Sequence, residues 1–199
     1  MYIPNSFIEH DKQRILSIAR EHGFATLITS RDGVPFASHL PLILDGDDTL
    51  IAYGHMAKAN EQWQHFASQQ EILLMFQGPH AYISPSNYKE AGVPTWNYAT
   101  VHLYGKASIV EDLDELKNII NTLTHKYEQH QPTPWIPEYS ERVLNAVVGF
   151  KVEVSRVEAK FKLSQNKSVV DQHSIIHNLR SNGGENQMGV ANLMEERCK

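Results

Sequence analysis

The fold is decided by one stretch of the sequence, residues 24–44, which reads FATLITSRDGVPFASHLPLIL. Residues 24–30 are rich in β-branched and apolar side chains, a composition typical of a β-strand. The turn signal Arg31-Asp32-Gly33 follows, and residues 34–44 resume an extended pattern. We therefore predict a β-hairpin in this part of the chain.

Four further strands are expected after the hairpin. They cover residues 49–54, 71–76, 95–110 and 147–157. The stretch 95–110 alternates, with Trp96 and Tyr98 on one face and Ala99 and Val101 on the other. Helical spacing predicts helices over 6–21, after Asn60 and over 112–128. Because no βαβ unit repeats, the sequence favours an antiparallel β-barrel with peripheral helices.

The predicted domain organisation is simple. Residues 1–166 form one barrel domain, and residues 167–199 form a short helix near 169–179 followed by a polar, mobile tail. With 18 Lys plus Arg against 23 Asp plus Glu, the net charge is 18 − 23 = −5 among 199 residues. This charge offers no general attraction to nucleic acid or anionic lipid.

The one cysteine and the composition of the N-terminal residues indicate the cellular compartment of the protein. Cys198 has no second cysteine with which to form an intramolecular disulfide, which fits a reducing environment. No signal-peptide pattern and no apolar run of membrane-spanning length is present. We expect a cytoplasmic protein without a membrane partner.

Familiar catalytic motifs are absent from the sequence. We find no GxGxxG, GxxxxGK[ST], HExxH, GxSxG or CxxC pattern. His173 and His177 stand four residues apart on a predicted helix, but no third ligand accompanies them. We interpret this pair as an exposed helix face and predict no metal site.

Three segments place polar side chains directly after apolar strands. In residues 54–63, Lys58 precedes a helix capped by Asn60, and Gly54 would allow close approach of the backbone to a phosphate. In residues 36–42, Pro41 predicts a bulged or edge strand around His39. Residues 76–86 and 93–102 interleave aromatic and hydrogen-bonding side chains, as a flat heteroaromatic ligand requires. Each segment also has a purely structural interpretation: a plain connection, a barrel histidine, or core and interface packing.

Together these segments resemble the PaiB-type family of FMN-binding negative transcriptional regulators. The resemblance rests on the following stretches: Met1–Pro4, Ser38–Pro41, Gly54–Asn60, Gly78–Ser86, Val93–Tyr98 and Phe161–Asn166. It implies the split β-barrel fold of the pyridoxamine-phosphate-oxidase-like flavoproteins, a homodimer, and FMN at the subunit interface.

The resemblance also implies roles for individual residues. Lys58 and Asn60 would hold the phosphate, with residues 38–42 lining the flavin and Gln77 and His80 near its ring. Trp96, Asn97, Lys162 and Gln165 would come from the partner subunit. The full set of expected FMN contacts is Ser38, His39, Leu40, Leu42, His55, Lys58, Asn60, Gln77, His80, Trp96, Asn97, Lys162 and Gln165.

Three functions stay open at this point. The first is an FMN-binding negative regulator of transcription that acts directly or through a partner or metabolism. Against direct DNA contact stand the charge of −5 and the lack of a helix-turn-helix with a basic recognition helix. The second is an FMN-dependent oxidoreductase acting on a small substrate. The third is a protein that binds or degrades haem.

Overall fold

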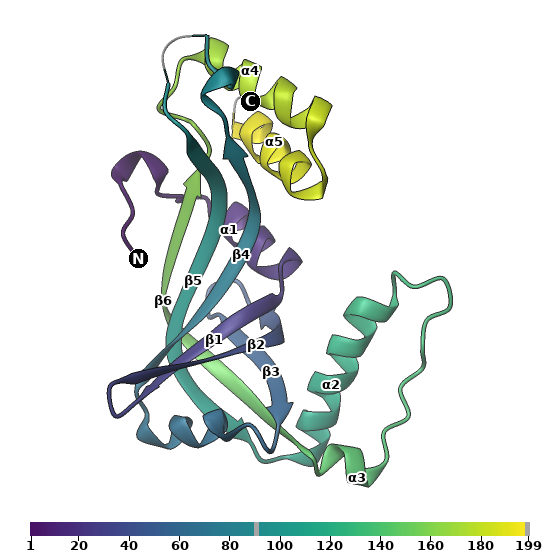
Figure 1. The fold of residues 1–199 in the computed structure, drawn as a ribbon. Helices are drawn as coiled ribbons and strands as arrows, with labels where there is room; N and C mark the ends of the chain where they lie inside the picture. Colours follow the sequence, from purple (N-terminus) through teal and green to yellow (C-terminus); the bar gives the residue numbers. More distant parts are fainter. Residues whose placement is uncertain (90–91, 198–199) are drawn as a thin grey trace. The chain divides into compact units, whose positions relative to one another are not determined.

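The structure is a computed structural model that describes residues 1–89 and 92–197 (Figure 1). Along the chain its elements are η1 (Asn5–Phe7), α1 (Lys12–Glu21), β1 (Phe24–Arg31), β2 (Val34–Asp45), β3 (Ile51–Ala57), η2 (Glu61–Ser68), β4 (Glu71–Ile83), η3 (Pro85–Asn87), β5 (Thr95–Val110), α2 (Leu113–Glu128), α3 (Glu141–Leu144), β6 (Val147–Lys162), α4 (Val169–Asn182) and α5 (Glu185–Arg197). The strands close a barrel in the order β1-β2-β3-β6-β5-β4. This confirms the predicted barrel with peripheral helices. Cys198, about which a prediction was made, lies outside the described residues.

The predicted hairpin is present as β1 and β2, which pair antiparallel from Phe24 opposite Pro41 to Arg31 opposite Val34. Its turn consists of Asp32 at φ 55° and Gly33 at φ 78°. Two successive positive φ angles match the right-handed twist of the flanking strands, and Asp and Gly tolerate that conformation. The local sequence therefore sets the register of the hairpin.

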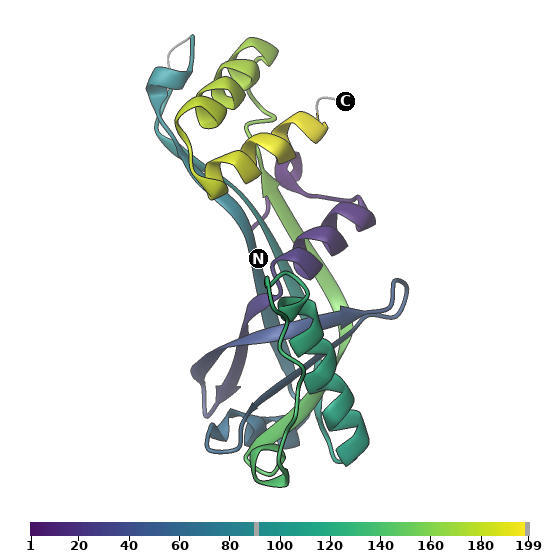
Figure 2. The same ribbon diagram turned by 90° about the vertical axis from the view of Figure 1, so that its right-hand side faces the viewer.

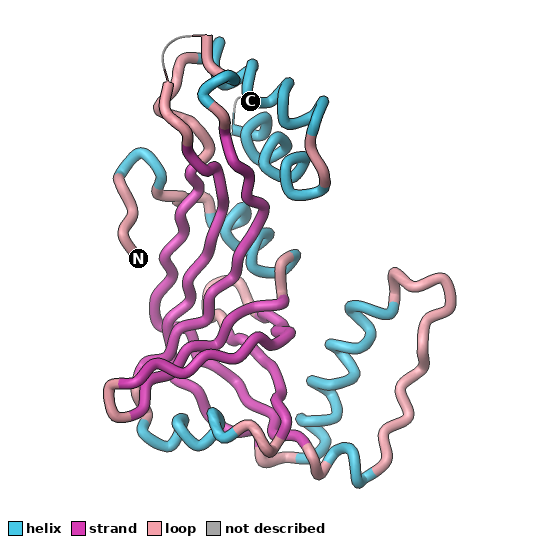
Figure 3. The backbone as a smooth tube through the Cα atoms, in the orientation of Figure 1, coloured by secondary structure: helices cyan, strands magenta, loops and turns pink. Residues whose placement is uncertain are grey.

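Two compact units make up the chain, and most of the barrel belongs to unit 2, which comprises Arg20–Phe76 and His102–Val157. Inside this unit Leu27, Leu74 and Phe150 are completely buried. A second cluster forms where α2 covers the sheet, with Leu116, Ile119, Ile120 and Leu123 packed against Ile43 and Tyr53. Figure 3 shows the long loop 129–140 that connects α2 to α3.

Unit 1 comprises Met1–Ala19, Gln77–Val101 and Glu158–Lys199. Its core contains Ile83, Ala99 and Phe161 from the strands, all completely buried. The helices α4 and α5 lie side by side (Figures 1 and 2). Arg180 of α4 forms a paired hydrogen bond with Glu195 of α5, at 2.8 and 2.7 Å.

The segment after Asn166 differs from the expectation of a short helix and a polar tail. It forms two helices, and Ile175, Leu179, Val190 and Met194 are all buried. These apolar residues are spread among polar ones, so the periodicity of residues 185–197 is weak in the sequence although the helix packs well. The boundary proposed at Asn166 stays a prediction.

The first predicted helix begins later than its spacing suggested. Ile8 forms a β-bridge with Lys160, and the amide of Glu9 donates to the carbonyl of Ala159 at 3.1 Å, so this part of the chain is extended. Asp11 then accepts from the amide of Gln13 at 2.8 Å and caps α1. Tertiary pairing therefore overrides helical spacing at Ile8 and Glu9.

The strand β4 continues through Gly78-Pro79, where the sequence predicted a break. A Cβ on Gly78 would lie 3.2 Å from Ile18 of α1, and the ring of Pro79 packs against Gly189 of α5. These contacts keep the dipeptide in the strand. Among the described residues, no helix is long and apolar enough to cross a membrane.

Candidate functional site

The loop after β3 carries Lys58, the first candidate phosphate ligand. The backbone of Lys58 is held on both sides, because its amide donates to the carbonyl of Ala146 at 2.8 Å and its carbonyl accepts from the indole of Trp63 at 3.0 Å. The side chain is exposed, and within residues 1–89 and 92–197 no ion pair engages its ammonium group. A fixed backbone thus presents a positive charge available to a ligand.

Asn60 joins this loop to the β1–β2 hairpin. Its side-chain oxygen accepts from the amide of Gln62 at 3.1 Å and caps η2, as predicted, although the helix is 3₁₀. Its side-chain nitrogen donates to the hydroxyl of Ser38 at 2.8 Å. The hydroxyl proton of Ser38 is then free to donate to another acceptor.

The residues of this corner fit a phosphate group. Lys58 supplies an ammonium charge, and Ser38 and the Asn60 amide supply neutral donors on adjacent elements. Gly54 has a packing role in the barrel, and its predicted close approach to a phosphate stays a prediction. A Cβ on Gly54 would lie 2.6 Å from Leu42 and 2.8 Å from Phe150, so the lack of a side chain at this position makes room for barrel packing.

Alternation along β2 divides the predicted contacts of residues 38–42 between two faces. Ser38 lies directly opposite buried Leu27, and Leu42 on the same face is 1% exposed. His39 points to the other face, where its Nδ1 lies 3.0 Å from the hydroxyl of Thr26. The side chains of Ser38 and His39 therefore cannot line the same side of one flat ring.

His55 lies on β3, and its buried Nδ1 has no hydrogen-bond partner among residues 1–89 and 92–197. Burial lowers the pKa of His55 from its ordinary value, because the imidazolium form loses its hydration. This shift favours the neutral imidazole of His55.

The second set of predicted residues lies in unit 1, on the parts of β4 and β5 that belong to this unit. The amide of Gln77 lies 3.4 Å from His80 Nδ1, and the ring centres of His80 and Trp96 are 6.2 Å apart. Tyr82 meets Trp96 edge to face at 6.0 Å. Tyr82 and Trp96 are both about half exposed, which leaves an aromatic surface for a further contact.

Lys162 on β6 turns toward β5. Its ammonium donates to the Thr95 hydroxyl at 2.6 Å and to the Trp96 carbonyl at 2.7 Å. Burial lowers the pKa of Lys162, and the charges of Lys160 and Lys167 lower it further. Because both of its bonds go to neutral oxygens, the positive charge of Lys162 has no compensating anion in the described part of the chain.

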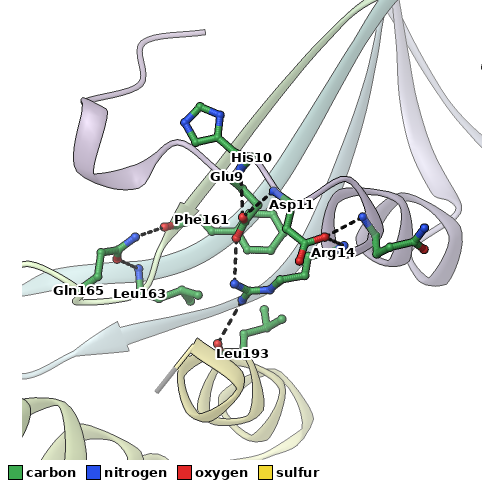
Figure 4. A network of polar contacts seen from close by, with 9 residues as sticks. Glu9, His10, Asp11, Arg14, Phe161, Leu163, Gln165 and Leu193 are labelled. Atoms are coloured by element: carbon green, nitrogen blue, oxygen red, sulfur yellow. Dashed lines mark hydrogen bonds and ion pairs between the residues drawn. The ribbon is translucent and has the colours of Figure 1, made fainter. Parts of the chain in front are cut away.

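Asn97 and Gln165, two of the expected FMN contacts, use their side chains in hydrogen bonds within the protein. Asn97 is completely buried and exchanges hydrogen bonds with Ser164 at 2.9 and 3.1 Å. Gln165 folds back onto its own turn, bonding the Phe161 carbonyl and the Leu163 amide at 2.6 Å each (Figure 4). Neither side chain presents a free polar group in this conformation.

One residue that the sequence analysis did not single out is Gln62. Its side chain is completely buried and bonds both strands of the hairpin. A glutamine in a short helix carries no recognisable sequence signal, so only the structure identifies it. Elsewhere, His173 and His177 are exposed on α4, and no three potential metal ligands converge among the described residues.

The closed six-stranded barrel has the fold of the split-barrel flavin-binding proteins. The sequence matches, over residues 1–156, a family model described as "Putative FMN-binding domain". The chain belongs to this family, and FMN is its cofactor. A relative in Bacillus subtilis, the protease synthase and sporulation protein PAI 2, is 41% identical over 205 residues, covering 100% of this chain and 99% of the relative.

Solved structures support the fold assignment. The FAD and heme binding protein from Mycobacterium smegmatis matches with a TM-score of 0.64 and 13% identity, covering 88% of this chain and 80% of that one. The flavocytochrome Anf3 from Azotobacter vinelandii matches with a TM-score of 0.61 and 17% identity, covering 78% of this chain and 69% of that one. At such low identities these likenesses show the fold alone.

Proposed function

We propose that this chain is an FMN-binding negative regulator of gene expression that acts as a homodimer in the cytoplasm. The single observation that carries the cofactor site is the Asn60–Ser38 hydrogen bond of 2.8 Å in the corner that presents Lys58. In this proposal Lys58, Asn60 and Ser38 hold the FMN phosphate. When bound, the isoalloxazine ring supplies one- and two-electron redox chemistry.

The regulatory part of the proposal is supported by the kinship with the B. subtilis sporulation protein. The net charge of −5 opposes the approach of a phosphate backbone, so we propose that regulation runs through a partner protein or through metabolism. In the homodimer, the partner subunit's Trp96 and the partner subunit's Lys162 would contribute to the flavin environment.

The experiment for the phosphate site compares FMN with riboflavin, which lacks the phosphate. Fluorescence titration of the wild type should give a much lower Kd for FMN than for riboflavin. Lys58→Ala should weaken FMN about tenfold or more, the usual size of a lost charge-assisted hydrogen bond, and leave riboflavin unchanged. Lys106→Ala, which removes another exposed lysine, is the control. Equal FMN affinity in Lys58→Ala and the wild type removes Lys58 from the site.

The oligomeric and regulatory parts have their own tests. Light scattering of the FMN-loaded protein should give twice the chain mass of 22.6 kDa. A DNA mobility shift that weakens steeply with salt would contradict the indirect route.

A further inference from the structure

The side chain of Gln62 is the most constrained polar group near the proposed phosphate site. It is 0% exposed, although it lies on η2, a short helix otherwise rich in polar residues. Its amide nitrogen lies 3.1 Å from the carbonyl oxygens of both Leu27 and Phe36. Backbone carbonyls only accept, so these two contacts fix the amide orientation with its NH₂ group toward the hairpin.

These two carbonyls belong to different strands of the hairpin. Leu27 of β1 lies directly opposite Ser38 of β2, and Phe36 precedes Ser38 by two residues. The Gln62 amide therefore ties β1 to β2 beside Ser38. Since one NH₂ group has two protons, the two carbonyls take up its donor capacity, and the Thr29 hydroxyl at 3.2 Å is a secondary contact.

Gln62 is also joined to the phosphate loop through its own backbone. Its amide N–H donates to Asn60 Oδ1, while Asn60 Nδ2 donates to Ser38. The hydrogen bonds form a closed ring: Gln62 binds Asn60, Asn60 binds Ser38, and the Gln62 side chain binds the hairpin backbone beside Ser38. Lys58 stands two residues before Asn60 on the same loop, and the indole of Trp63, the residue after Gln62, donates to its carbonyl at 3.0 Å.

The network continues away from the site. Thr29 is buried, and its hydroxyl lies 2.8 Å from Nδ1 of His65, which comes one helical turn after Gln62. The Oε1 atom of Gln62 has no partner among the described atoms, so burying this side chain is costly. The two donated bonds also satisfy the carbonyls of Leu27 and Phe36, which an apolar residue at this position would leave without this donor.

We propose that Gln62 is the positioning residue of the phosphate cradle, because it locks Asn60 against Ser38 and so sets where Lys58 presents its ammonium group. This inference rests on the proposed function of that corner. Gln62 itself is buried and does not touch the ligand.

The test measures FMN and riboflavin binding to the full-length protein carrying Gln62→Met. Methionine keeps the length and apolar volume of the side chain but donates no hydrogen bond. FMN affinity should fall about tenfold or more while riboflavin affinity stays within about twofold, because only the phosphate contacts lose their alignment. Thr29→Val, which leaves both bonds to the hairpin carbonyls, is the matched control and should keep the ratio of the two Kd values.

Each other outcome overturns the inference. A parallel loss of FMN and riboflavin affinity in Gln62→Met would mean a merely structural role, and unchanged affinities would mean no role. Where Gln62→Met does not fold, Gln62→Asn shortens the reach of the amide and is judged by the same ratio, with riboflavin binding as the sign of a folded site. A wild type that binds FMN no better than riboflavin refutes the phosphate cradle itself, independently of any variant.

Discussion

Asn97 and Ser164 exchange two hydrogen bonds in the interior of unit 1, from Nδ2 to Oγ at 2.9 Å and from Oγ to Oδ1 at 3.1 Å. Both residues are buried, and Ser164 has a φ of 60°. The pair joins β5 to the turn after β6 and accounts for an asparagine that the sequence analysis assigned to the cofactor.

Two substitutions of Ser164 separate the hydrogen bonds from the backbone conformation. Ser164→Ala should lower the free energy of unfolding by about 1–3 kcal/mol, because the Asn97 amide loses its buried partner. Ser164→Gly also loses the hydroxyl but relieves the positive φ, so it should be roughly 1 kcal/mol more stable than Ser164→Ala. Urea denaturation of both variants gives the comparison, and a Gly variant weaker than the Ala variant would contradict it.

The ion pair between Glu9 and Arg14 predicts an asymmetric response to mutation (Figure 4). The Glu9 side chain is 8% exposed and that of Arg14 is 21% exposed. Arg14→Met removes the counterion of a buried carboxylate, which then keeps only two backbone amides as donors, and should cost up to about 3–5 kcal/mol of unfolding free energy. Glu9→Gln leaves a cation that is closer to water and should cost about 1–2 kcal/mol. Equal losses in urea denaturation would show that burial does not set the cost.

His55 should make stability depend on pH. Burial lowers its pKa in the folded protein below the unfolded value of about 6.5, so between these values the unfolded chain binds more protons. The stability contributed by neutral His55 is therefore complete above about pH 6.5 and is lost as the pH falls toward the folded pKa. Comparing urea midpoints at about pH 7.5 and 5.5, His55→Gln should lose less stability than the wild type.

The control for this pH effect is His173→Gln on α4, where the side chain is exposed. This variant should keep the pH dependence of the wild type. If the stability of His173→Gln changed with pH as little as that of His55→Gln, the pH effect would belong to surface histidines in general.

Gly54→Ala tests the packing role assigned to that glycine. The added Cβ would lie 2.6 Å from Leu42 and 2.8 Å from Phe150, so overpacking should cost about 1–3 kcal/mol. In a Leu42→Val background the added methyl gains space, and the cost of Gly54→Ala should be smaller. A strictly additive double-mutant cycle in urea denaturation would argue that the two side chains do not compete for this space.

The strands were predictable from the sequence because alternation and turn chemistry are local. The turn at Asp32-Gly33 and the alternation that buries Ala99 and Val101 are both legible residue by residue. The start of α1 and the passage of β4 through Pro79 were not, because each depends on partners distant in the sequence, Lys160 and Gly189.

For the candidate site, residue types were predictable and side-chain directions were not. Lys58 and the cap at Asn60 follow from the order strand, loop and helix. The burial of Asn97 depends on Ser164, 67 residues further along the chain, and the turn conformation of Gln165 has no signature in the residue types.

By itself the sequence determined the hairpin, the antiparallel class of the barrel and the kinship with FMN-binding proteins, because these depend on local pattern and motif order. Only the tertiary structure decided that the Gln62 side chain donates hydrogen bonds to both strands of the hairpin beside Ser38. The physical reason is that a buried polar side chain must satisfy its donors on whichever backbone groups the fold brings to it. No local pattern in the chain records which groups those are.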